Sequence, residues 1–249
     1  MSLGIWIGYA SILALSVLYP LIKLWHASAS EFVLIKPYFY GVLAGLVLYG
    51  LPFYVMMATQ GWFLTNLSVW LFVFLLAFLK ALLGELGKRA VSRFGNVSMF
   101  KYRYYYPLGL GFSTSLLVIL FALPLERFIW ASRLYVSQGI WPDETIFFAG
   151  TTVIGMVHMF VLIVALVEFE VGLTILSGLS RNKNRSRYWW MAFSLSLMGS
   201  FFLLYPIASW TIRYVAVLLV MFLGKGLVFR YRESFSKYLT QQNSFRGFK

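Results

Sequence analysis

The stretch TIFFAGTTVIGMVHMFVLIVALVEFEVGLTIL, from Thr145 to Leu176, decides the fold of this chain. It is longer than the ~20 mostly apolar residues that a membrane-crossing helix needs. Its only ionisable side chains are His158, Glu168 and Glu170. The stretch therefore predicts a membrane helix that is tilted or that projects into the cytoplasm at one end.

Further apolar segments of the same kind lie on both sides of this helix. Together they predict an all-α, polytopic bundle of seven spans. This bundle forms a single transmembrane domain over residues 1–232, and a polar cytoplasmic tail follows over residues 233–249. The other predicted spans are Leu3–Ile22, Pro37–Met57, Trp62–Leu83, Tyr105–Leu125, Tyr188–Leu204 and Trp210–Phe229.

The composition supports a membrane protein. Apolar residues make up 61% of the chain and charged residues only 12%, whereas soluble domains average about 45–50% and about 25%. A soluble fold of this size has no means of hiding that much apolar surface, but lipid covers it. The chain has no cysteine, which excludes disulfides and thiolate chemistry. The segment from Met1 to Ile22 lacks Lys and Arg, so we interpret it as a retained first span rather than a cleaved signal.

Basic residues are distributed unevenly between the two sets of loops. Of the 21 Lys and Arg residues, 18 fall on one set of loops with the C-terminal tail, and three (Arg127, Arg133 and Arg213) fall on the opposite set. Cytoplasmic loops carry the excess of Lys and Arg in membrane proteins. We therefore expect a multi-pass protein of the cell membrane with its N-terminus outside and its C-terminus in the cytoplasm. This pattern explains the net charge of +13 without nucleic acid as a partner.

Ionisable side chains inside membrane helices are costly and are functional candidates. Glu85 lies near the cytoplasmic end of the third predicted span, and Lys88 and Arg89 follow it at i+3 and i+4. One interpretation is an ion pair on the helix surface, worth a few tenths of a kcal/mol. The other is a general base or polar anchor that faces the interior of the bundle.

His158 lies in the middle of the fifth predicted span. A lone histidine in this setting usually bonds a hydroxyl or carbonyl group of a neighbouring helix. A metal ligand needs partners, and the residue one turn on is Leu162. Glu168 and Glu170 are two residues apart and therefore point to different faces of their helix. We expect them to reach the cytoplasmic interface or to pair with the basic loop from Arg181 to Arg187.

Aromatic residues cluster at the ends of predicted spans, where membrane proteins carry aromatic belts. We expect the following residues to lie at the membrane surface for that reason: Tyr102, Tyr104, Tyr105, Tyr106, Trp189 and Trp190.

Two short motifs carry a family resemblance: KALLGELGKR, from Lys80 to Arg89, and YPLGLGF, from Tyr106 to Phe112. Together they resemble the YhfC and PrsW group of intramembrane metalloproteases. That group is related to the CAAX prenyl proteases and to the anterior-pharynx-defective scaffold subunit of γ-secretase. The resemblance implies that Glu85 takes the second position of a Glu-Glu-x-x-Arg-type motif and Lys88 the Arg position. His158 would be the histidine of the fifth span.

The chain departs from the protease pattern at positions that matter for chemistry. Gly84 stands where the first Glu of the pair is expected, and Ser113, Thr114 and Ser115 stand where the Gly-rich span carries a Glu or His. A zinc protease needs about three protein ligands and a base, which Glu85 and His158 alone cannot supply. The resemblance therefore implies a dismantled site, as in the γ-secretase scaffold.

The sequence thus favours a non-catalytic membrane scaffold or assembly subunit that binds lipids and other membrane subunits and needs no cofactor. Two alternatives remain open: an active intramembrane metalloprotease with a diverged site, for which zinc would be required, and a transporter or channel component. Glu85 and His158 are the candidate catalytic or metal-binding residues. The polar residues expected to support them are Lys88, Arg89, Ser113, Ser115, Glu168 and Glu170.

Overall fold

A computed structural model describes residues 3–31, 34–51, 54, 69–94, 101–138, 153–180, 186–204 and 215–230. Within these ranges the chain is helical and contains no strand, so the all-α prediction is confirmed for the described residues. The predicted turn at Pro206 and the predicted tail, residues 233–249, lie outside them.

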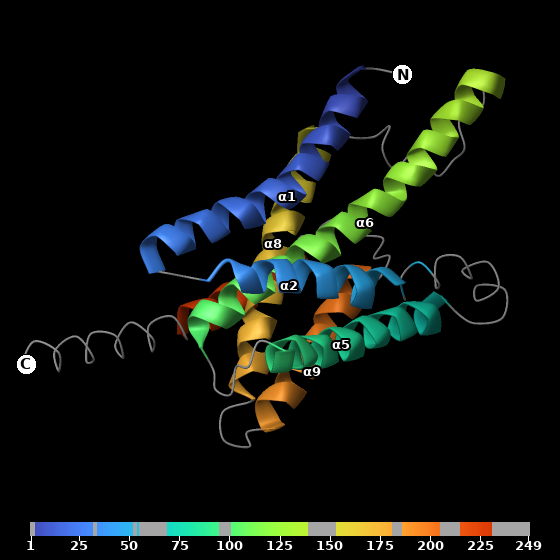
Figure 1. Ribbon diagram of the computed structural model, residues 1–249. Coiled ribbons are helices and arrows are strands. Elements are labelled where there is room, and N and C mark those ends of the chain that lie inside the picture. Colours follow the sequence, from blue (N-terminus) through green and yellow to red (C-terminus); the bar gives the residue numbers. More distant parts are fainter. Residues whose placement is uncertain are drawn as a thin grey trace, which may run out of the picture.

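The helices follow the predicted apolar segments in chain order (Figure 1). Residues 215–230 are also helical and overlap the last predicted segment. The helices are α1 (Leu3–Glu31), α2 (Lys36–Gly45), α5 (Val69–Phe94), α6 (Tyr102–Gln138), α8 (Val153–Leu179) and α9 (Ser186–Leu204), with a π-helical turn η1 (Leu46–Gly50) continuing α2.

Several helices extend past the ends that the hydropathy predicts. The third predicted span ends at Leu83, whereas α5 continues to Phe94 and carries Glu85 and Lys88 in its second half. Glu and Lys are good helix formers and do not end a helix. Hydropathy marks where a segment stops being apolar, which is a different position from where its backbone hydrogen bonds stop.

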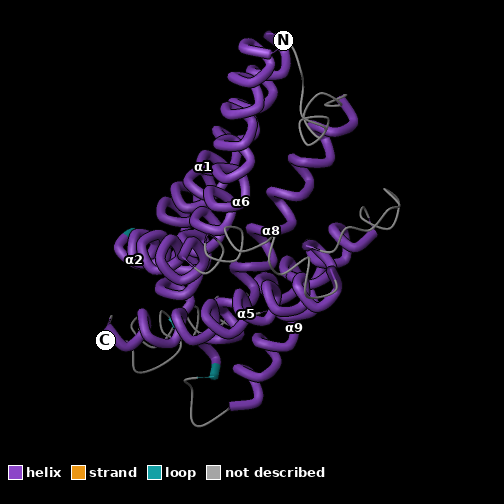
Figure 2. The backbone as a smooth tube through the Cα atoms, turned by 90° about the vertical axis from the view of Figure 1, so that its right-hand side faces the viewer, coloured by secondary structure: helices purple, strands orange, loops and turns teal. Residues whose placement is uncertain are grey.

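Two helical stretches among the described residues are long and apolar enough to cross a membrane, Ala10–Ala29 of α1 and Phe160–Leu179 of α8. They differ in their surroundings, because 28% of the first stretch and 78% of the second are buried inside the protein. In Figures 1 and 2, α8 lies in the middle of the bundle. It contacts α6 and α1 on one side and α9 and α5 on the other.

The crossing of α2 and α6 depends on two glycines. A Cβ atom at Gly41 would lie 2.4 Å from the carbonyl oxygen of Leu108, and one at Gly111 would lie 2.1 Å from that of Tyr38. Helices in membranes associate closely where small residues face each other. Any larger side chain at these two positions would push the backbones of α2 and α6 apart.

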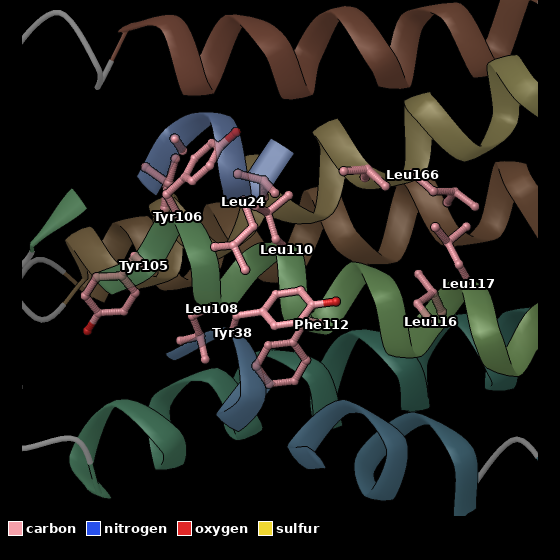
Figure 3. Close-up of a cluster of buried hydrophobic side chains, with 14 of the residues drawn as sticks. Leu24, Tyr38, Tyr105, Tyr106, Leu108, Leu110, Phe112, Leu116, Leu117 and Leu166 are labelled. Carbon is pink, nitrogen blue, oxygen red and sulfur yellow. The ribbon is translucent and has the colours of Figure 1, made fainter. Parts of the chain in front are cut away.

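A cluster of buried side chains around the start of α6 forms the largest part of the core (Figure 3). Tyr102 and Tyr105 belong to this core and are each only 1% exposed. The expected membrane-surface belt stays a prediction, but these two rings are packed inside the protein, whereas Trp190 of the same expected belt is 58% exposed. The two tyrosines pack against neighbouring helices, and a Cβ at Gly178 of α8 would lie 2.7 Å from the ring of Tyr105.

Candidate functional site

Two helices contribute a stripe of polar side chains to the centre of the bundle. On α5, Lys80 and Lys88 are eight residues apart, so two helical turns place them on one face. Glu85 lies three residues before Lys88, within reach along the helix. On α8, Glu170 and Ser177 are seven residues apart and likewise share a face. The contact between α5 and α8 brings these two stripes together.

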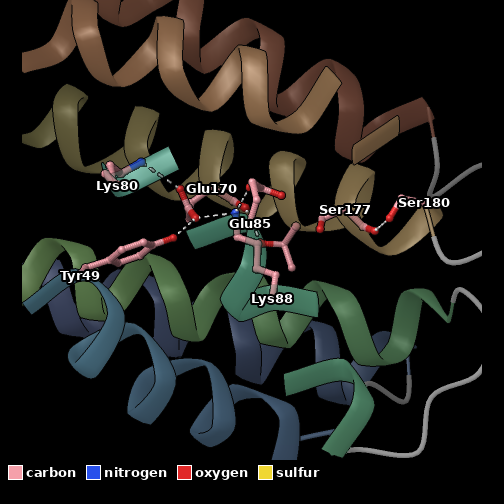
Figure 4. A network of polar contacts seen from close by, with 8 residues as sticks. Tyr49, Lys80, Glu85, Lys88, Glu170, Ser177 and Ser180 are labelled. Carbon is pink, nitrogen blue, oxygen red and sulfur yellow. Dashed lines mark hydrogen bonds and ion pairs between the residues drawn. The ribbon is translucent and has the colours of Figure 1, made fainter. Parts of the chain in front are cut away.

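Lys88 joins the two carboxylates of the cluster (Figure 4). Its Nζ lies 2.7 Å from Oε1 of Glu85 and 2.7 Å from Oε1 of Glu170. Lys80 approaches the same Glu170 from the other side, with Nζ 3.5 Å from Oε2. The cluster thus contains two ammonium groups and two carboxylates, and its net charge is zero when all four are ionised.

The cluster is shielded from solvent. Glu85 is 0% exposed, and Lys88 and Glu170 are each 1% exposed. An isolated ionised group in such a place is strongly disfavoured, and a buried charge persists only when paired and hydrogen-bonded. Of the two interpretations of Glu85 that the sequence left open, the geometry matches a polar anchor facing the interior.

Tyr49 also belongs to the cluster and comes from η1, the π-helical turn that continues α2. Its hydroxyl donates a 2.7 Å hydrogen bond to Oε1 of Glu170. Lys80 Nζ lies 5.7 Å from the centre of the Tyr49 ring, within range of a cation–π interaction. Irregular π turns often occur at functional positions in helices. Here the turn carries the tyrosine that reaches across to α8.

Gly84 makes room for this tyrosine. A Cβ atom at Gly84 would lie 2.6 Å from the Tyr49 hydroxyl oxygen. Any side chain at this position, including the Glu of the protease motif, would compete with Tyr49 for the same space. Where the protease motif has a Glu, this chain has Gly84, and the space is occupied by Tyr49, which binds Glu170.

Glu168 forms a second, separate ion pair on another face of α8. It contacts the ammonium group of Lys23 on α1 and accepts a 3.3 Å hydrogen bond from the hydroxyl of Tyr19. Glu168 and Glu170 do point to different faces, as expected. Among the described residues their lysine partners come from α1 and α5, and the expected pairing with the loop from Arg181 to Arg187 stays a prediction. Residues 181–185 lie outside the described part of the chain.

The remaining support residues lie near the cluster without joining it. Ser115 of α6 donates a 2.7 Å hydrogen bond to the carbonyl oxygen of Val42 on α2, which ties these helices together. Ser113 donates to the carbonyl of Leu110 in its own helix, at 2.8 Å. The guanidinium of Arg89 lies 5.6 Å from the ring centre of Trp189 on α9.

The backbone of His158 lies away from the cluster that holds Glu85. Glu85 lies at the level of Glu170 and Ser177 on α8, because Lys88 bridges the two carboxylates. His158 is part of α8, but its side chain lies outside the described part of the structure. Its backbone lies twelve residues before Glu170, which at about 1.5 Å per residue is roughly 18 Å along the helix axis. A shared site would have to span that distance.

Three buried oxygen atoms of the cluster have no hydrogen-bond partner among the described residues, and one of them, Oε2 of Glu170, is ion-paired with Lys80. Ser177 faces Glu85, yet neither Ser177 Oγ nor Oε2 of Glu85 makes a hydrogen bond of ordinary geometry with the described residues. Among those residues, no group of three His, Asp or Glu side chains is placed to hold a metal ion. As it stands, the arrangement holds helices together and orders charges in a chain.

Sequence reasoning missed Tyr49, Lys80, Lys23 and Tyr19 as parts of these clusters. The spacing of Lys80, Gly84 and Lys88, each four residues from the next, was the available signal for a polar stripe on α5. Tyr49 gave no such signal, because it lies 121 residues from Glu170 along the chain. No known protein family, curated protein or solved structure matches this chain.

Proposed function

We propose that this chain is a non-catalytic integral membrane scaffold or assembly subunit with seven spans, an outside N-terminus and a cytoplasmic C-terminus. The proposal rests on the way the carboxylates of Glu85 and Glu170 are paired with cations inside the bundle. Glu85 is held by Lys88, and Glu170 is held by Lys88, Lys80 and Tyr49. A catalytic carboxylate must reach substrate or a metal-bound water, whereas these two are already bound to cations inside the bundle.

The resemblance to the intramembrane protease superfamily is part of the same proposal. In that reading, Glu85 and Lys88 keep positions of the protease motif but use them for an internal ion pair, and Gly84 serves Tyr49. Separating one partner from a buried ion pair costs about 3–5 kcal/mol. A carboxylate held this firmly supports a structural role more than a catalytic one.

Exposed apolar side chains on the outer helices support the membrane part of the proposal. Trp25 of α1 is 76% exposed and Leu43 of α2 is 66% exposed. Phe222, in the helix over residues 215–230, is also an exposed apolar residue, at 64%. Apolar surface of this extent is stable against lipid tails or against the helices of partner subunits.

The proposal is tested by comparing the wild type with Glu85→Gln and His158→Ala after purification from membranes. We expect alkaline extraction to leave the protein in the membrane pellet and elemental analysis to find no stoichiometric zinc. A reporter fused after Lys249 should be cytoplasmic. About one zinc per chain that is lost in His158→Ala would overturn the scaffold in favour of the metalloprotease. Release of the protein by alkaline extraction would overturn the membrane assignment itself.

One observation favours a second candidate, a component of a transporter or channel. Lys80, Glu170, Lys88 and Glu85 form an uninterrupted chain of ionisable groups inside the bundle. Proton pathways in membrane proteins use such chains. Proton flux into liposomes that contain the purified wild type, but not Glu170→Gln, would support transport. Equal flux for both proteins would exclude this cluster as a pathway.

A further inference from the structure

Four exposed basic side chains stand at the ends of four different helices. Lys36 begins α2, Arg93 lies in the last turn of α5, Lys101 directly precedes α6, and Arg187 lies in the first turn of α9. We call these four residues the basic rim. Within the described residues, no carboxylate forms an ion pair with any of them. Lys80 and Lys88, in contrast, are paired inside the bundle.

Three contacts hold the four helix ends at one end of the bundle. The backbone N–H of Leu34, beside Lys36, donates to the carbonyl oxygen of Arg103 at 3.2 Å. The hydroxyl of Tyr104 donates to the carbonyl oxygen of Val91 at 3.2 Å, which joins the start of α6 to the end of α5.

The third contact joins the end of α5 to the start of α9. Arg89, in the last part of α5, stacks its guanidinium 5.6 Å from the ring centre of Trp189 at the start of α9. The helix ends that carry the rim residues are therefore joined by the folded chain, although Lys36 and Arg187 are far apart in sequence. The starts of α2 and α6 and the end of α5 lie toward the same side of the molecule in Figure 1.

Exposed aromatic and apolar side chains border the rim. Phe39 and Tyr40 follow Lys36 on α2, and Trp190 follows Arg187 on α9; all three are exposed. About one turn further from the rim, Leu43 on α2 is also exposed. The order of cation, amphipathic aromatic and aliphatic side chains matches the order of headgroup, interface and hydrocarbon in a bilayer.

We propose that the basic rim binds the phosphate groups of anionic lipids in the cytoplasmic leaflet. The inference rests on the proposed membrane function and adds a partner of defined chemistry to it. Lipid is the occupant that fits, because a lipid presents its phosphate directly above acyl chains that cover the exposed aromatic and aliphatic residues. A soluble phosphate or a nucleic acid would leave those apolar neighbours in water.

The experiment measures which lipids the protein retains. The full chain is reconstituted from an equimolar mixture of phosphatidylcholine and phosphatidylglycerol, extracted in mild detergent, and its bound lipids are quantified by mass spectrometry. An attraction of about 1 kcal/mol per basic residue near the surface corresponds to about fivefold enrichment. We expect the wild type to retain phosphatidylglycerol over phosphatidylcholine by at least that factor, and the enrichment to fall at high salt.

Two variants are compared with the wild type: one removes the positive charges of the basic rim, and the other keeps them. The fourfold variant Lys36→Gln, Arg93→Gln, Lys101→Gln and Arg187→Gln should lower the enrichment to the ratio of the mixture. The control, Lys36→Arg with Lys101→Arg, preserves the charge and should behave like the wild type. The four positions are exposed, so neither variant disturbs the core. A circular dichroism melt confirms this for each protein.

The outcomes separate this inference from the proposed function. A protein that enters the bilayer but retains both lipids equally overturns the lipid inference and leaves the membrane scaffold standing. The same holds if the fourfold Gln variant keeps the wild-type enrichment. A protein that binds inorganic phosphate at the rim, with no preference between lipids, also overturns the inference. A chain that never enters the bilayer overturns both.

Discussion

Helices α1 and α8 pass the same test for crossing a membrane, but they occupy opposite environments. Most of the apolar stretch of α8 is buried inside the bundle, whereas only 28% of that of α1 is buried. Helix α8 carries both Glu168 and Glu170, which are buried. Helix α1 contributes one ammonium group, from Lys23, and presents Ile22 and Trp25 outward.

Under the proposed membrane function, the difference reflects where a helical bundle places its ionisable residues. A charge that faces lipid is expensive, so such residues face the interior, where they pair with one another. Glu168 and Glu170 therefore connect α8 to α1 on one face and to α5 on another. Under the same proposal, the outer helix α1 needs only apolar contact with lipid and one polar attachment, from Lys23 to Glu168. On this reading α8 is the hub of the bundle and α1 is a peripheral element.

The largest effect should come from breaking the hub. Glu170→Ala removes the carboxylate that binds Lys88, Lys80 and Tyr49. It leaves one lysine in excess inside the protein, and separating a buried pair in this way costs about 3–5 kcal/mol. Denaturant unfolding in detergent micelles, followed by circular dichroism, measures the loss. A destabilisation under about 1 kcal/mol would show that α8 does not depend on this cluster.

Filling the space that Gly84 leaves open should have the next largest effect. In Gly84→Ala the new methyl group would lie 2.6 Å from the Tyr49 hydroxyl oxygen. Overpacking of this kind costs about 1–3 kcal/mol. A thermal melt of the single variant and of Gly84→Ala with Tyr49→Leu measures the coupling. We expect the double variant to lose less than the sum of the two single losses. Strict additivity would mean that Gly84 and Tyr49 do not share this space.

Cutting the attachment of α1 should cost less. Lys23→Gln removes the ammonium partner of Glu168 but leaves the hydroxyl of Tyr19 in place. The Lys23 side chain is 30% exposed, so water screens part of the interaction. We expect a loss of about 1–2 kcal/mol, the scale for leaving a buried acceptor with fewer partners. Limited proteolysis should then cleave near α1 before it cleaves elsewhere. Uniform cleavage across the chain would argue against a separate peripheral α1.

The smallest effect should come from the outer surface of α1. Ile22→Ala changes a side chain that is 62% exposed, so the stability in detergent should change by less than ~0.5 kcal/mol. The matched control is Ile175→Ala on α8, because Ile175 is fully buried, and removing buried methylene groups costs about 2–5 kcal/mol. Equal losses for the two variants, measured in parallel unfolding curves, would remove the distinction between hub and periphery.

Much of the helical architecture follows from local patterns. Apolar runs predicted helices at α8 and α9 in nearly the correct places, whereas α1 continues to Glu31, nine residues past the predicted end at Ile22. The ends of α5 and α6 were misplaced, because polar residues that form helices well lie beyond each apolar run. The tyrosines at the start of α6 were expected at the membrane surface because they lie at the end of a predicted span. Their burial depends on packing against α8, which no local pattern reports.

The sequence by itself determined that the described chain is helical and apolar, and that Glu85, Lys88, Glu168 and Glu170 are its exceptional residues. These properties depend on side-chain chemistry and on the helical period, both of which act over a few residues. Only the tertiary structure decided which charges meet. Glu168 and Lys23 are 145 residues apart, and Glu170 and Tyr49 are 121 residues apart. Contacts at such separations depend on how whole helices pack, because a helix fixes the face on which a residue lies but not the neighbour that this face contacts.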